Sequence, residues 1–131
     1  MIMTTVIQKL KQSNGTPVFI CDFSPPRGAD VSVVEQVQSV GADFVAVAYS
    51  PGRSVRVDST VMAHLIAQAG GQDVIFNLAS RDMNKLALQN HLLGAQLLGL
   101  QNVIVLQGDG FTEKDREVVK AVEGVGRNQP P

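Results

Sequence analysis

Short apolar runs alternate with longer amphipathic stretches along most of the chain. The apolar runs cover residues 18–20, 44–47, 74–76 and 103–106. They are rich in valine and isoleucine and show no regular alternation with polar residues, which is typical of parallel strands buried on both faces. We therefore expect four buried strands.

A recurring signal precedes three of these strands. Gly41, Gly71 and Gly99 each follow an amphipathic stretch, and a few residues separate each glycine from the next apolar run. Helices commonly end at glycine because the residue after the helix adopts a left-handed conformation. The signal predicts an α/β fold of four successive parallel β-α units of roughly 29 residues each. Right-handed crossovers leave two architectures, a small open sheet with helices on both faces or part of a (β/α)8 barrel.

The amphipathic stretches predict one leading helix, at about residues 3–12, and three helices that follow the first three strands. Candidate N-terminal caps are Thr4 or Thr5, Asp30, and Asp58 or Ser59. The side chains expected to face inward in the later helices are Val33, Val34, Val37 and Val40, then Val61, Met62, Leu65, Ile66 and Ala69, then Leu86, Leu92, Leu93, Leu97 and Leu98. A weak further helix is expected from Thr112.

These elements indicate one half-barrel domain over residues 1–124 and a disordered tail over residues 125–131. Four units are half the strands of a (β/α)8 barrel. A half-barrel leaves two sheet edges and an apolar inner face open, and such surfaces strongly favour association with a partner. We therefore expect a homodimer, or a partner subunit that completes the barrel.

Composition and charge narrow the class of protein. Hydrophobic residues make up 44% and charged residues 18% of the 131 residues, as in a globular domain. A net charge of -1 gives no reason to expect nucleic acid or an acidic membrane surface as a partner. No apolar stretch approaches the ~18 residues of a membrane span, so we expect a soluble, cytoplasmic protein. The one cysteine, Cys21, is expected to be a buried thiol.

Polar residues gather where each expected strand ends. They are Asp22, residues 49–53, Asn77 with residues 80–82, and residues 107–109. In parallel α/β folds these carboxyl ends meet at one rim, and catalytic residues gather there. The sequence therefore predicts a functional site at this rim.

The arginines of the rim have two interpretations. Arg53, Arg56 and Arg81 are candidates for binding anionic substrate groups or phosphates. Alternatively, the loops are ordinary solvated connections in which Asp82 caps a helix and the arginines are surface charges. His64 and His91 fall within expected helices and are interpreted as structural or solvated, and no phosphate-binding loop or metal-ligand spacing is present.

Residues 22–30, Asp-Phe-Ser-Pro-Pro-Arg-Gly-Ala-Asp, resemble the opening motif of the methylenetetrahydrofolate reductase family, which usually begins with glutamate. The resemblance continues through residues 48–56, 77–84 and 92–109 and spans about residues 17–122. The chain looks most like the short, bacterial catalytic-domain form of the family. This resemblance implies a flavoprotein with an FAD-bearing (β/α)8 TIM barrel, of which the four units match the first half.

The resemblance also implies an activity. Such oxidoreductases take electrons from NAD(P)H or another donor and reduce 5,10-methylenetetrahydrofolate to the 5-methyl form, in one-carbon metabolism and methionine biosynthesis. Asp22 matches the acid that protonates the folate before reduced flavin delivers a hydride, and Asp109 matches an aspartate beside the flavin and the pterin. The residues that match cofactor contacts of the family are Ala48, Tyr49, Pro51, Asn77, Gln107, Gly108 and Asp109.

The chain departs from the family pattern at several of these positions. Asp22 is one methylene shorter than glutamate, Asn77 stands where histidine or glutamine is common, and Gln107 stands where some members have arginine. Family residues from strands five to eight have no counterpart. Three hypotheses follow: a reductase completed by a second half-barrel or another subunit, a non-catalytic accessory half-barrel that binds folate or flavin, and a piece of a longer enzyme.

Overall fold

A computed structural model describes residues 3–110 and 112–113 of the chain. Its strands are β1 (Ile20–Phe23), β2 (Phe44–Val47), β3 (Val74–Ala79) and β4 (Val103–Leu106). Its α-helices are α1 (Val6–Ser13), α2 (Val34–Val37), α3 (Ser59–Gly70) and α4 (Lys85–Leu97). Two short 3-10 helices, η1 (Pro51–Arg53) and η2 (Ser80–Asp82), lie just after β2 and β3.

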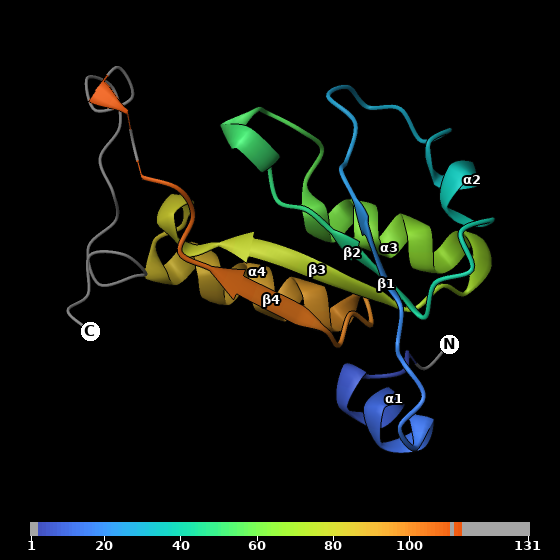
Figure 1. The fold of residues 1–131 in the computed structure, drawn as a ribbon. Helices are drawn as coiled ribbons and strands as arrows, with labels where there is room; N and C mark the ends of the chain where they lie inside the picture. The colour runs from blue at the N-terminus through green and yellow to red at the C-terminus, as the bar shows by residue number, and fades with distance from the viewer. Residues whose placement is uncertain (1–2, 111, 114–131) are drawn as a thin grey trace.

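The four strands form one parallel sheet in the order β1-β2-β3-β4 (Figure 1). The strand order never reverses, as it would in a doubly wound sheet, so right-handed crossovers carry α2, α3 and α4 to the same face. Figure 1 shows α3 and α4 together behind β2 and β3. The predicted α/β fold of four parallel β-α units is confirmed, and of the two architectures the strand order favours the partial (β/α) barrel.

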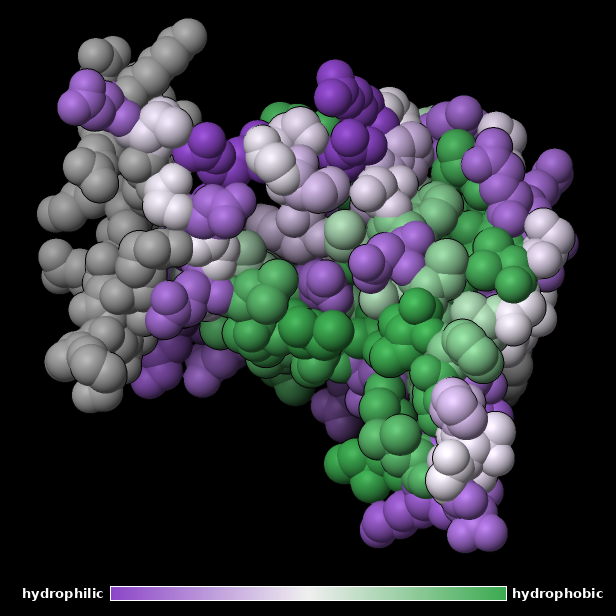
Figure 2. All heavy atoms as spheres, viewed as in Figure 1, coloured by the Kyte–Doolittle hydropathy of each residue, from purple (hydrophilic) through white to green (hydrophobic). Residues whose placement is uncertain are grey.

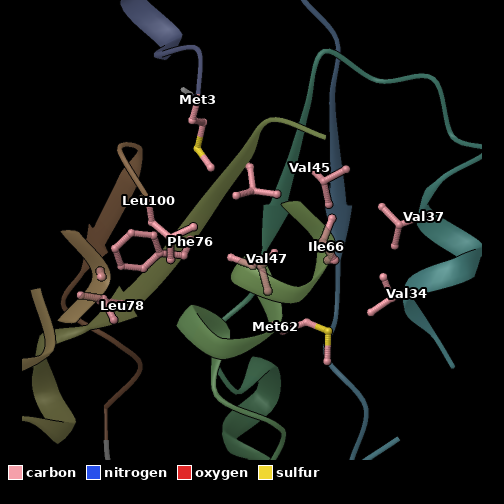
Figure 3. Close-up of a cluster of buried hydrophobic side chains, with 13 residues drawn as sticks. Met3, Val34, Val37, Val45, Val47, Met62, Ile66, Phe76, Leu78 and Leu100 are labelled. Carbon is pink, nitrogen blue, oxygen red and sulfur yellow. The ribbon is translucent and has the colours of Figure 1, made fainter. Parts of the chain in front are cut away.

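The main core lies between the helices and the two central strands (Figure 3). Val45 and Val47 of β2 and Phe76 and Leu78 of β3 are fully buried in this core, as is Met62 of α3. Each fully buried large side chain contributes about 1.5–3 kcal/mol relative to an exposed one. The expectation of strands buried on both faces is therefore correct for β2 and β3.

The opposite face of the sheet, which we call the inner face, has a smaller apolar cluster. Phe44, Ala46 and Ile75 are buried there, and Val6 of α1 and Val18 pack against them. Side chains alternate between the two faces of a strand, and the strands pair in register Asp22 with Ala46 and Asn77 with Ile104. The inner face therefore also carries the following residues of the outer strands and of β3: Ile20, Asp22, Asn77, Ala79, Ile104 and Leu106.

The outer strands contradict the expectation of burial. Phe19 and Ile20 are 68% and 52% exposed, and the residues of β4 are 40–55% exposed. Each outer strand has a neighbour on one side only, so apolar composition alone does not bury it. β1 also extends to Phe23, so Asp22 lies within the strand instead of after it, and the thiol of Cys21 is only partly buried.

The three later helices all differ from expectation, and in α3 the difference is limited to side chains such as Val61, which is 48% exposed instead of facing inward. α2 is a single turn whose N-cap is Val33, because the Asp30 carboxylate instead accepts hydrogen bonds from the backbone N–H and hydroxyl of Ser32, at 2.9 and 2.6 Å. Val40 therefore lies outside the helix and is exposed. In α4 only Ala95 is buried, and the five leucines expected to face inward are exposed, Leu97 by 91%. α4 covers the end of the sheet, where the described residues place no further helix beside it.

Three polar residues stand immediately before β2, β3 and β4, and they join α1 to the sheet. Asn102 accepts a hydrogen bond from the Val6 N–H at 3.0 Å and donates to the carbonyls of Thr4 and Val74 at 3.0 and 3.1 Å. Asp73 accepts from the Thr4 N–H at 3.0 Å, and Asp43 accepts from the Phe19 N–H at 2.8 Å. We call Asp43, Asp73 and Asn102 the N-terminal hub.

Several helix-end predictions are confirmed. Thr5 caps α1 in a capping box with Gln8, Asp58 caps α3, and Gly71 and Gly99 follow α3 and α4 with positive φ. Gly41 also has positive φ, but α2 has already ended at Val37. α1 begins later than expected, and Met3 before it is buried in the main core. The expected helix from Thr112 falls mostly, and the tail at residues 125–131 entirely, outside the described residues. No helix among the described residues is long and apolar enough to cross a membrane.

Candidate functional site

The inner face carries two polar side chains near the carboxyl ends of the strands. Asp22 on β1 is exposed, and Asn77 on β3 is partly buried. Between them lie Ala46 of β2 and Ala48, which directly follows β2 and whose N–H donates to the Phe23 carbonyl at 2.9 Å. The small alanines leave no bulky side chain between the carboxylate and the amide.

Asn77 has an unusual environment. Its side-chain oxygen Oδ1 is buried and has no hydrogen-bond partner among the described residues, whereas its backbone carbonyl accepts from the Ser59 hydroxyl at 2.6 Å. Leaving such an acceptor unpaired costs about 1–3 kcal/mol, so a buried orphan in a native fold calls for an explanation. A ligand N–H or O–H that reaches the inner face would supply the missing donor.

A second group of polar residues joins the loops after β2 and β3. The Arg81 guanidinium makes a two-pronged contact with the Asp82 carboxylate, at 2.8 Å for both nitrogens, and the Tyr49 hydroxyl donates to the same carboxylate. Burial, followed by the negative charge of Asp82 and this hydrogen bond, raises the pKa of Tyr49 to about 12. The Arg81 hydrogen bond lowers the pKa of Asp82. Asp82 is therefore an ion-pair partner, and Asn84 is the cap of α4.

Arg81 also holds the loop after β4. Its backbone N–H donates to the Gln107 carbonyl at 3.1 Å, and Nη1 donates to the Asp109 carbonyl at 2.8 Å. Gly108 between them has a φ of +87°, and a Cβ added there would lie 3.3 Å from the Arg81 Cβ. The loop therefore depends on glycine at position 108 both for its backbone conformation and for its close approach to Arg81.

The rim arginines share one kind of contact. Arg53 donates to the Gly110 carbonyl at 3.0 Å, Arg56 donates to the Pro25 carbonyl at 2.9 Å, and Arg81 donates to the Asp109 carbonyl. Each therefore ties one loop to another through a main-chain acceptor. These contacts show that the three side chains are more than solvated surface charges, and their binding of anionic groups stays a prediction.

The structure thus divides the predicted site residues into two groups. Asp22, Ala48 and Asn77 lie at the inner face, whereas Tyr49 is linked through Asp82 and Arg81 to residues 107–109. Asp22 and Asp109 come from β1 and from the end of β4, which are opposite edges of the sheet. Pro51 lies in η1, the short helix that ends at Arg53.

Sequence reasoning missed the link formed by Tyr49, Asp82 and Arg81. Its only signal was an arginine and an aspartate adjacent to each other after a strand. His91 fits its structural interpretation, because its Nε2 lies 2.6 Å from the Thr60 hydroxyl and joins α4 to α3. Among the described residues, no group of three or more His, Cys, Asp or Glu side chains is arranged to hold a metal ion.

Comparison with known protein families identifies a relationship. A family model described as methylenetetrahydrofolate reductase matches residues 6–128 of the 131-residue chain. The match includes all four strands and every loop that carries a candidate site residue.

Proposed function

The chain belongs to the methylenetetrahydrofolate reductase family, and from this premise we propose that its inner face binds FAD and a folate. The proposed reaction is the reduction of 5,10-methylenetetrahydrofolate to 5-methyltetrahydrofolate. NAD(P)H or another reductant is the proposed electron donor. The orphan oxygen of Asn77 is the observation that carries this proposal.

The residues at the carboxyl ends of the strands suit a flavin ring. A flavin presents an imide N–H, which is the kind of donor that the buried Oδ1 of Asn77 lacks. Ala48 and Gly108 add little or no side chain, which allows a flat ring to approach the main chain. Tyr49, Pro51, Gln107 and Asp109 are the remaining proposed contacts. When bound, FAD would supply the hydride, while the protein supplies orientation and local charge.

Asp22 is the proposed proton donor to the folate. Its carboxyl group lies on the inner face, on the same side of the sheet as Asn77, and it is accessible from solvent. A side chain in that position reaches a substrate that lies over the inner face without any rearrangement of the core. Asp109 is proposed to lie beside the flavin and the pterin, on the loop held by Arg81.

A second candidate function is a folate- or flavin-binding half-barrel without catalysis. The exposure of Asp22 favours it, because proton transfer is most effective from a side chain held in a closed, water-excluding site. The third hypothesis, a piece of a longer enzyme, uses the same binding residues. Retention of FAD without turnover would favour either of these over the complete reductase.

The exposed outer strands bear on the proposed partner. The four residues of β4, and Phe19 and Ile20 just before and at the start of β1, are exposed, and Figure 2 shows apolar side chains gathered over β4. We propose that a second copy of the chain or another subunit covers them. Light scattering at micromolar concentration is expected to give a mass above that of one chain, and a stable monomer would contradict a homodimer.

The first test of function is an absorbance spectrum of the purified protein, recorded before and after addition of FAD and again after desalting. Flavin bands that remain with the protein are expected. The Asn77→Ala variant is expected to lose these bands without losing thermal stability, because the deleted oxygen is already unpaired. The matched control is Asn90→Ala, which removes an exposed amide from α4. A wild-type protein that retains no flavin bands after desalting would contradict the proposal.

A further inference from the structure

Arg81 is the most deeply buried charged side chain at the carboxyl end of the sheet. It lies in η2 directly after β3 and is only 9% exposed. Removing a guanidinium from water is costly unless each donor finds a partner in good geometry. Its two-pronged contact with Asp82 supplies the charge partner, and the Asp109 carbonyl takes a third donor.

The contacts of Arg81 converge on one short segment. Its backbone N–H and its Nη1 bind the first and third carbonyls of residues 107–109, and its side chain lies against Gly108. On the other side, Asp82 accepts the Tyr49 hydroxyl. One arginine therefore connects the loops that follow β2, β3 and β4, although these loops are far apart in the sequence.

We propose that Arg81 is a positioning residue that sets the conformation of residues 107–109 and thereby the direction of the Asp109 carboxylate. The effect of Arg81 on the binding of FAD and folate rests on the proposed function. The role in shaping the loop does not, because it follows from contacts within the protein itself.

The shape of the guanidinium is what this role requires. A planar fork binds both oxygens of Asp82 and still has a donor left for the Asp109 carbonyl, whereas a lysine ammonium is a single point of charge. Lysine at position 81 keeps the charge but cannot hold both partners in the same geometry. The loop is then free to shift, and misplacement of a catalytic group by about 1 Å can cost ~10²-fold in rate.

The test compares Arg81→Lys with Arg56→Lys. Arg56 is a matched control because it also ties two rim loops through a carbonyl, but its acceptor is Pro25, next to β1. The first readout is the amide NMR spectrum without FAD. We expect Arg81→Lys to move the Gly108 and Asp109 amide resonances, and Arg56→Lys to leave them in place. The second readout is FAD affinity, which we expect Arg81→Lys to weaken about tenfold while shifting the bands of bound FAD.

Asp82→Asn provides a second variant if Arg81→Lys does not fold. It keeps the shape of the partner but removes its charge, so it is expected to move the same two resonances by less. Unmoved Gly108 and Asp109 amides in a folded Arg81→Lys or Asp82→Asn protein would overturn the positioning role. If the amides move and the wild type binds no FAD, the proposed function fails while the positioning of the loop stands.

Discussion

The two ends of the same sheet hold their polar side chains in different ways. At the N-terminal end, Asp43, Asp73 and Asn102 bind the main chain of the segment around α1 and β1. At the carboxyl end, the Oδ1 of Asn77 is buried without a partner and Asp22 is exposed. The N-terminal end has its hydrogen-bonding capacity filled by the fold. At the carboxyl end the loop arginines are paired as well, but Asn77 and Asp22 on the inner face keep capacity in reserve.

This difference separates stability from function. Polar groups that bind the main chain within the fold contribute to stability. An unpaired buried acceptor costs stability, and it is retained where a bound ligand supplies the missing donor. In (β/α) folds, chemistry gathers at the carboxyl ends of the strands and stabilising residues at the N-terminal ends. Substitutions at the two ends should therefore be separable, with loss of activity at one end and loss of folding stability at the other.

Asp22 at the carboxyl end gives the largest expected effect. Asp22→Ala is expected to retain FAD and to lower folate reduction by about 10²–10⁴-fold, the usual contribution of a general acid. Initial rates with 5,10-methylenetetrahydrofolate measure this loss, and the thermal midpoint should stay unchanged because the side chain is exposed. The control is Asp30→Ala, which removes an exposed carboxylate that binds only Ser32 among the contacts described above. Unchanged turnover in Asp22→Ala would remove this residue from the mechanism.

Asn102 at the N-terminal end gives the opposite signature. Asn102→Ala removes three hydrogen bonds and leaves buried main-chain groups of Thr4, Val6 and Val74 without them. We expect the free energy of unfolding to fall by about 2–4 kcal/mol. Urea denaturation measures this change, with Asn90→Ala as the exposed control. Full stability in Asn102→Ala would show that the N-terminal hub does not hold α1 to the sheet.

The alternation of strands and helices could be predicted because its signals are local. Gly71 and Gly99 end their segments through their own backbone conformation, and the apolar runs of β2 and β3 are buried as expected. Burial of an outer strand is not a local property. β4 is as apolar as β2, but its burial depends on neighbours that its own residues do not specify.

The candidate site could be predicted only in outline. The sequence places Asp22, Asn77 and residues 107–109 at one rim, because parallel strands end on the same side. It does not show that Arg81 turns toward the Asp109 carbonyl or that Asn77 lacks a partner, since both depend on packing between loops distant in sequence. The N-terminal hub was missed for the same reason, as Asn102 acts on Thr4 and Val6.

Tyr49 is the only tyrosine of the chain, so its ionisation can be followed in the near-ultraviolet spectrum. Its pKa is expected near 12 in the folded protein, against the ordinary value of 10.0. Because folding raises this pKa, the stabilisation it reflects is present at neutral pH and is lost as the pH rises through about 12. Asp82→Asn removes the nearby negative charge and should lower the pKa of Tyr49. If the pKa of Tyr49 were the same in Asp82→Asn as in the wild type, Tyr49 would not share the Asp82 carboxylate with Arg81.

The smallest expected effect separates charge from hydrogen bonding within the N-terminal hub. Asp43 accepts the Phe19 N–H through one oxygen and lies 3.2 Å from the Lys9 ammonium through the other. Exposed ion pairs contribute little, because water screens the charges and both side chains lose freedom. Lys9→Met should therefore leave the urea midpoint unchanged, whereas Asp43→Ala should lower it by removing the acceptor for Phe19. Equal losses in the two variants would mean that charge holds this end of the sheet together, and the contrast with the carboxyl end would then rest on Asp73 and Asn102 alone.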